Sequence, residues 1–562
     1  MKVHKKIKLI YTLILPAWLI PAVCPAQQQP YSEEVTVIAA FKPVIPDANK
    51  ISFNPRIEDT ILPKPQFRYT IASTPYPTTY KPEPIEAAKM AGEPIRKLHE
   101  NLLKLGFGTY MTPYADYFFN STRSRSLAYG VNAKHLSSSG KISGYGFPGY
   151  SENKLSFFAK KFSEKKHNLF ADGGLARKVV HYYGYHPEDY NPAPDKDDIR
   201  QRFILANLNT GISSASPDSS RLAYSARLNT ALLTDKYKSR ETHVALNGGI
   251  ERSDQLLKFS KTQRWGIQTA IDYFNDKAEN RHASGRAVIA IKPFLSAKRN
   301  ALQLRAGFNT SIEADSTAHL HLYPDIEARA NLLPERLTLY FGLNGKLERN
   351  SYRMFTEENP FVDPGIPLSF KNTRINVYGG FNANLFDLFD LFFELSRSQV
   401  ENQYFYVNDF SDSLNNKFTL LYDDNCDVFK LTSELAWHYS DRFRMAYRIH
   451  MHQYFTSDVL PWHISDYNMS LTLAYNIRDK LLFDAALLYY DRMYAIQYGP
   501  GGAIESKYLR DRLDLNLGIE YRYSELIGAF IRLNNLANIQ YYYWNEYPAQ
   551  KMNAMAGLSF SF

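Results

Sequence analysis

Two histidines in one segment of the chain have the spacing of metal ligands. His319 and His321 are two residues apart, and residues at that spacing lie on the same face of an extended strand. A His-x-His pair on a strand can bind zinc. The same face continues through Asp325, Glu327 and Arg329, whose charges are mixed. Because such a row is typical of a polar wall facing water, we favour lumen lining over a metal site.

Four basic residues share the wet face of the segment 443–455, which we expect to line the lumen: Arg444, Arg448, His450 and His452. A row of cationic side chains along a pore can draw anions through it. Acidic side chains on neighbouring segments can instead pair with these groups and cancel their field. The sequence leaves both interpretations open.

Five aromatic residues gather in what we expect to be the last external loop: Tyr541, Tyr542, Tyr543, Trp544 and Tyr547. Such a group can stack on a sugar or a partner protein, or it can form part of an aromatic girdle at a membrane surface.

Two acidic clusters, 195–198 and 423–427, lack the spacing and the glycine of a calcium loop, so we interpret them as solvated loops.

No pairing of a nucleophile with a base is recognisable in the sequence. The glycine-rich stretch 499–502 has no strand-to-helix context and does not predict a phosphate cradle. We therefore predict that the protein is not an enzyme and that it holds no cofactor or metal.

The segments that carry these side chains alternate between apolar and polar residues. In 337–347 and 513–523 apolar residues occupy every second position, with polar residues between them, and 443–455 and 469–477 follow the same rule. Period two over about ten residues predicts strands with one apolar and one wet face. Short links such as 334–336, 440–442, 478–480 and 524–525 alternate with long ones such as 186–199, 351–368, 456–464 and 497–511. Short turns at one end and long loops at the other are typical of a transmembrane barrel.

The composition agrees with a barrel in the outer membrane. Aromatic residues make up 14% of the chain, with 41 Tyr and 35 Phe, and the wall and rims of a barrel use such residues. The mean hydropathy of −0.38 argues against a helical membrane protein. A net charge of +9 over 562 residues is too weak a field to suggest nucleic acid. The two cysteines, Cys24 and Cys426, exclude a disulfide scaffold.

The chain divides into three parts. Residues 1–26 have a basic start, an apolar middle and a small residue before a polar run, which predicts a signal peptide cut after Ala26. The alternative is a lipoprotein signal acylated at Cys24. Residues 27–100 are rich in proline and predict an extended periplasmic or lumenal arm. Residues 101–562 predict an all-β, antiparallel barrel of about 22 strands, with 20 as the alternative.

The end of the chain resembles the closing hairpin of TonB-dependent receptors. The resemblance rests on 530–536, on the tyrosine-rich stretch 541–548 and on 556–562, and 106–110 is similar to the entry into their first barrel strand. Glu34, Val35, Thr36 and Val37 look like a TonB box. The general appearance is that of receptor-like barrels from Bacteroidota. Only a short, proline-rich stretch separates this box from the barrel, so a plug domain of the family's kind does not fit.

The resemblance implies a transport-related barrel or channel without a standard plug. The alternative is a structural or assembly subunit of an outer-membrane complex. Expected partners are outer-membrane lipid, the barrel-assembly machinery and, through the box, TonB or other envelope proteins, but no nucleic acid. In the family a terminal aromatic on the lipid face is the insertion signal, which places that role here on Leu558, Phe560 and Phe562.

Overall fold

The computed structural model describes residues 68, 70, 72 and 98–562, except 164–166, 216–221, 259, 261, 279–282, 315–316, 335, 458 and 499–503. The signal peptide, nearly all of the arm and the TonB-box-like residues Glu34, Val35, Thr36 and Val37 lie outside the described residues, and their roles stay predictions. Within those residues, no helix has the length and apolar character needed to cross a bilayer.

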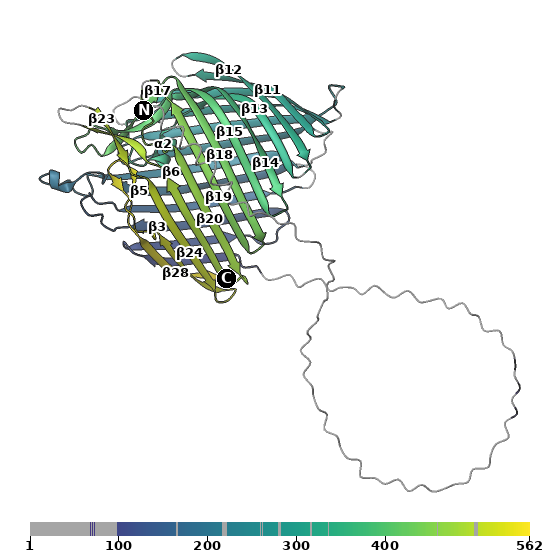
Figure 1. Cartoon of the computed structure of the whole chain (residues 1–562), viewed down its shortest axis with the longest axis horizontal. Coiled ribbons are helices and arrows are strands. Elements are labelled where there is room, and N and C mark those ends of the chain that lie inside the picture. The colour runs from purple at the N-terminus through teal and green to yellow at the C-terminus, as the bar shows by residue number, and fades with distance from the viewer. Residues whose placement is uncertain are drawn as a thin grey trace, which may run out of the picture. The chain divides into compact units, whose positions relative to one another are not determined.

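The described chain forms one closed sheet of 22 antiparallel strands, as the alternation predicts (Figure 1). Neighbours in sequence pair with one another, and the last strand pairs with the first, from Leu102 with Ser561 to Gly108 with Met555. The strands are β1 (Asn101–Gly108), β2 (Thr112–Asn120), β3 (Leu127–Ser138), β4 (Tyr150–Lys161), β5 (His167–His181), β6 (Arg200–Ser214), β7 (Ala223–Thr234), β8 (Arg240–Ser253), β9 (Thr262–Lys277), β10 (Ser284–Arg299), β11 (Leu302–Ala314), β12 (Ala318–Leu333), β13 (Leu337–Arg349), β14 (Phe370–Leu385), β15 (Phe389–Glu401), β18 (Cys426–Ser440), β19 (Phe443–Phe455), β20 (Tyr467–Ile477), β21 (Leu481–Tyr490), β24 (Arg512–Arg522), β25 (Ile527–Asn534) and β28 (Asn553–Ser561). Closure leaves no free sheet edge, which is what lets strands cross a membrane.

The two faces of the wall differ as the period of two requires. Large apolar side chains on the outer face are exposed, such as Leu322 at 70% and Phe341 at 59%. Polar and charged side chains occupy the alternate, inward positions. An apolar belt of this extent would make a soluble protein aggregate, whereas a barrel wall presents it to lipid.

An aromatic ladder lies on the outer wall near the turns that join β14 to β15, β18 to β19 and β20 to β21. Trp437 contacts Phe389 and Phe443 at ring-centroid distances of 6.0 and 5.5 Å, and Phe443 contacts Tyr475 at 6.0 Å. Tyr439 completes the group and is 67% exposed. Such girdles mark the depth at which a barrel meets the lipid headgroups.

The longest links between strands all lie at one end of the barrel. Short turns, such as 300–301, 441–442 and 478–480, lie at the end where the chain terminates. The long links lie at the opposite end, and they include 182–199, 350–369, 402–425, 456–466, 491–511 and 535–552. Because barrels place short turns in the periplasm, the end with the long loops is the external one.

Most of the long loops carry structure of their own. They hold the helices η2 (Pro187–Asp189) and α2 (Tyr352–Glu358) and three hairpins: β16 (Gln403–Asp409) with β17 (Lys417–Asp423), β22 (Met493–Tyr498) with β23 (Ile504–Leu509), and β26 (Tyr542–Trp544) with β27 (Tyr547–Pro548). The Ser351 side chain begins α2 by accepting a hydrogen bond of 3.1 Å from the amide of Met354. In Figure 1 the labels α2, β17 and β23 gather at the end opposite the C-terminus. We call the described residues of these six loops the external cap.

Candidate functional site: the external cap and its chamber

The external cap has a hydrophobic core built from loops far apart in sequence. Tyr547 is fully buried and stacks on Phe361 at 3.9 Å between ring centroids. Its ring also contacts Tyr183 at 4.8 Å and Phe418 at 5.8 Å, and its hydroxyl donates to the carbonyl of Asn416. Four different loops therefore meet around one tyrosine.

Backbone pairing reinforces this core. The amide of Asp363 donates to the carbonyl of Phe418 at 2.8 Å, and the amide of Phe418 donates to the carbonyl of Phe361 at 3.0 Å. These bonds form a short parallel bridge between loop 350–369 and hairpin β16–β17. A second parallel bridge joins Trp462 to Tyr494. The loops are thus paired as strands are, as well as packed.

His463 joins four loops through hydrogen bonds. Its Nδ1 lies 2.8 Å from the carbonyl of Tyr406, and its Nε2 lies 3.3 Å from the amide of Asn545. Only a neutral ring with its proton on Nδ1 satisfies both contacts, because the second requires an acceptor. Its own amide donates to the carbonyl of Tyr494 at 2.8 Å. Burial lowers the pKa of His463 to about 4, which keeps the ring neutral near pH 7.

Buried polar groups anchor α2 to the barrel wall. Glu241 on β8 accepts a hydrogen bond from the amide of Tyr352 at 2.5 Å. The hydroxyl of Tyr352 donates to Asp235 at 2.9 Å, and burial raises the pKa of both Asp235 and Tyr352. Arg349 lies beside this contact in an ion pair with Asp276, and its side chain is 1% exposed. The hydrogen bonds from Tyr352 to Glu241 and Asp235 tie α2 to the wall, whereas Nε and Nη1 of Arg349 and Oδ1 of Asp276 are buried without a hydrogen-bond partner.

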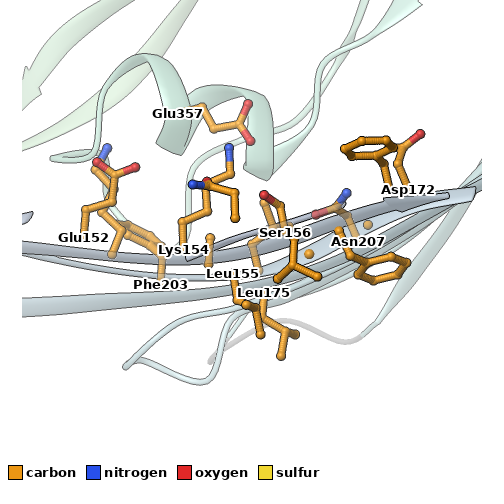
Figure 2. Close-up of a pocket in the computed structure, with 18 of the residues that line it drawn as sticks. Glu152, Lys154, Leu155, Ser156, Asp172, Leu175, Phe203, Asn207 and Glu357 are labelled. Atoms are coloured by element: carbon orange, nitrogen blue, oxygen red, sulfur yellow. The ribbon is translucent and has the colours of Figure 1, made fainter. Parts of the chain in front are cut away.

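A pocket of about 680 Å³ lies between α2 and the inner wall of β3–β7 (Figure 2). The wall supplies Glu152, Lys154 and Lys178, and α2 supplies Arg353 and Glu357. In Figure 2, Glu357 extends from the helix toward the wall that carries Glu152 and Lys154. The pocket therefore brings both signs of charge into one space, beside apolar side chains such as Phe203 and Leu233.

A second pocket, of about 620 Å³, adjoins the first and shares Lys178 and Glu357 with it. It extends to β24 and to loop 535–552, where Asp514, Tyr541 and Tyr543 line it. We call the two pockets together the chamber. Its lining combines charged, amide and phenolic groups with apolar side chains such as Phe203 and Leu205, and the polar groups can hydrogen-bond to a solute.

The histidines that could have formed a metal site have separate partners. His319 contacts the hydroxyl of Thr317 at 2.8 Å, whereas His321 contacts Glu313 at 3.1 Å and stacks on Tyr323. Within the described residues, no three His, Cys, Asp or Glu side chains are grouped as metal ligands would be.

The basic row on β19 lies on one face of the strand. Arg448 pairs with Glu434 at 2.7 Å, and His450 contacts Thr432 at 3.3 Å. The rings of His450 and His452 lie parallel, 6.4 Å apart, and Arg444 is exposed. The ion pair cancels one of the charges, and a role in anion selection stays a prediction.

The predicted aromatic loop is mostly internal to the cap. Tyr547 and Trp544 belong to its core, and Tyr541 is 3% exposed and donates to Asp514 at 2.9 Å. Tyr542 contacts the hydroxyl of Tyr145 at 3.1 Å, whereas Tyr543 is 47% exposed. Sequence reasoning found this cluster but missed its partners in other loops, along with His463 and Glu241, because no local pattern marks them.

The closing strand presents Leu558, Phe560 and Phe562 on one face. Leu558 is 48% and Phe562 is 60% exposed. The amide of Phe562 donates to the carbonyl of Asn101 at 3.1 Å, and the amide of Asn101 donates back at 3.0 Å. The terminal residue therefore takes part in closing the barrel, and its role as an insertion signal stays a prediction.

Comparison with known proteins supports the fold. No family model and no curated protein matches the chain. Among solved structures, it is similar to the FrpB iron transporter of Neisseria meningitidis, with a TM-score of 0.63, 8% identity and coverage of 83% of this chain and 82% of that one. It is also similar to FpvA of Pseudomonas aeruginosa bound to an iron-pyoverdine complex, with a TM-score of 0.62, 9% identity and coverage of 83% and 72%. It is similar as well to the siderophore receptor PirA of Acinetobacter baumannii, with a TM-score of 0.61, 11% identity and coverage of 83% of this chain and 81% of that one.

At these identities the likeness shows a shared fold. A closed barrel with a lipid-facing belt and an aromatic girdle belongs in the bacterial outer membrane. The chain is an outer-membrane barrel that resembles receptors and iron transporters.

Proposed function

We propose that this chain is a transport-related outer-membrane barrel, similar to TonB-dependent receptors, in which the external cap closes the lumen. The observation that carries the proposal is the shared core of the cap, where Phe361, Phe418 and Tyr547 from three loops are packed together. Loops that extend separately from the rim of an open pore would not be expected to pack around a common buried core.

The width of the barrel makes a closure necessary. A barrel of about 22 strands has a lumen that is plugged in working transporters. The arm that we predict for residues 27–100 is too short and too rich in proline for a standard plug. We therefore assign the closure to the cap, and we assign to Glu34, Val35, Thr36 and Val37 the contact with TonB.

The chamber supplies the solute site in this proposal. Lys154 and Lys178 face carboxylates such as Glu152 and Glu357 in the same space. Such a lining favours a hydrophilic solute that has both hydrogen-bond donors and acceptors. Passage then requires the cap to open, and α2 carries chamber residues with it.

The test is conductance of the purified protein in a planar bilayer. The full chain, a chain lacking residues 27–100 and the cap variant Tyr547→Ala are compared. The proposal expects little conductance from the first two and more from the third. If deletion of 27–100 alone opens the pore, then the arm is the closure and the proposal is wrong. If all three forms stay closed and stable partners co-purify, the structural or assembly role replaces it.

A further inference from the structure

A groove of about 530 Å³ runs along the outer wall over β1–β6, on the face opposite the chamber. Figure 2 shows Leu155 and Leu175 pointing away from the chamber that Lys154 and Ser156 line. Alternation along β4 and β5 places Asn153 and Arg177 on the same outer face as these leucines. The outward side chains of the groove therefore face away from the chamber, although the groove and the chamber border the same stretch of β4 and β5.

Small side chains form the floor of the groove. Ala133 lies in register between Tyr117 on β2 and Leu155 on β4, and Ala115 lies opposite His135. The methyl groups leave a trough between larger neighbours, of which Leu155 is 46% and Leu175 is 56% exposed. An apolar trough of this kind on a lipid-facing wall fits an extended hydrocarbon chain.

The external end of the groove is polar. His135 contacts Asn153 at 2.8 Å and Ser137 at 3.2 Å, and Asn153 lies opposite Arg177 in the register of β4 and β5. Arg202 follows on β6, opposite Val179, one step closer to the external end of the wall.

Among the residues that the structure describes, the two guanidinium groups have no anionic partner. Neither Arg177 nor Arg202 forms an ion pair with another residue of the described chain. A cation facing hydrocarbon is costly, whereas a guanidinium at headgroup depth binds phosphate with two parallel hydrogen bonds. The apolar trough therefore matches the acyl chain of an anionic lipid, and the arginines at its end match the charged headgroup.

We propose that the groove binds one lipid of the outer leaflet, with an acyl chain over Ala115 and Ala133 and its phosphate headgroup at Arg177 and Arg202. The apolar trough and the basic end together carry the assignment, and basic sites on membrane proteins recognise lipid headgroups in this way. This inference stands whether or not the barrel transports a solute.

Native mass spectrometry of the full chain released from nanodiscs tests the proposal. The nanodiscs contain equal parts of phosphatidylglycerol and phosphatidylcholine with the same acyl chains. We expect retained phosphatidylglycerol to exceed phosphatidylcholine, and the double variant Arg177→Glu, Arg202→Glu to lower that ratio about tenfold or more. Ala133→Trp fills the trough and should release both lipids.

Matched controls change other sites of the outer wall in the same way. Arg240→Glu alters an exposed arginine on β8, and Ala226→Trp enlarges an outward alanine on β7. Both should retain lipid as the unchanged protein does. Heat-modifiable migration of every variant checks that the barrel has folded. Equal retention of the two lipids by the unchanged protein overturns the proposal, and so does an equal loss in Arg240→Glu. Release by free inorganic phosphate with no preference for lipid would overturn it as well.

Discussion

Replacing Tyr547 with alanine should loosen the external cap while leaving the barrel intact. The side chain is fully buried, stacks on Phe361 and donates a hydrogen bond to the carbonyl of Asn416. Truncating a buried aromatic side chain costs about 3–5 kcal/mol, and the orphaned carbonyl adds about 1 kcal/mol. We take about 4 kcal/mol as the working value, which corresponds to roughly a thousandfold rise in the population of the open cap.

Hydrogen exchange measures that rise directly. The amides of Asp363 and Phe418, which bridge two loops of the cap, should exchange about a thousandfold faster in Tyr547→Ala, provided that they exchange by opening of the cap. Amides in the middle of the barrel strands should be unchanged. Tyr543→Ala is the matched control, since it removes the same residue type from the same loop at a 47% exposed position. Unchanged exchange at Asp363 and Phe418, or equal acceleration of barrel amides, would refute the reasoning.

Three further predictions concern single groups. The depressed pKa of His463, about 4 against an ordinary 6.5, means that its neutral ring stabilises the cap fully above pH 6.5. That contribution, about 3 kcal/mol, should fade as the pH falls toward 4, and exchange of cap amides should lose this dependence in His463→Asn. Arg349→Ala strands the buried carboxylate of Asp276 and should cost about 3–5 kcal/mol in thermal unfolding, whereas Arg374→Ala, at an exposed pair, should cost less than about 1 kcal/mol. Phe562→Asp should abolish outer-membrane insertion, measured by membrane fractionation, and normal levels of that variant would count against the insertion signal.

The barrel could be predicted because its rules are local. Alternation in 337–347 and 513–523 needs only neighbouring residues, and the sorting of links needs only their lengths. The closing contact between Asn101 and Phe562 follows, since a barrel must join its first strand to its last. The number of strands could be predicted for the same reason, because each strand has its own alternating pattern in the sequence.

The cap could not be predicted in this way. Phe361, Phe418 and Tyr547 come from three loops, and each looks like an ordinary aromatic residue in its own segment. His463 has its neutral form set by carbonyl and amide groups of other loops, which no spacing reveals. Loop-to-loop packing depends on the wall that brings the loops together, so it appears only in the folded chain.

Thiol labelling on whole cells shows whether the external cap closes the lumen. A single cysteine is placed in the chamber as Ser156→Cys, in a chain whose buried Cys426 is changed to serine and whose Cys24 belongs to the predicted signal peptide. A membrane-impermeant thiol reagent is then added from outside, with Tyr508→Cys, at a 51% exposed position on hairpin β22–β23, as the accessible control. A closed cap should give slow labelling at residue 156, fast labelling at residue 508, and fast labelling at both once Tyr547→Ala is added. Equally fast labelling of the two cysteines with the cap intact would contradict it.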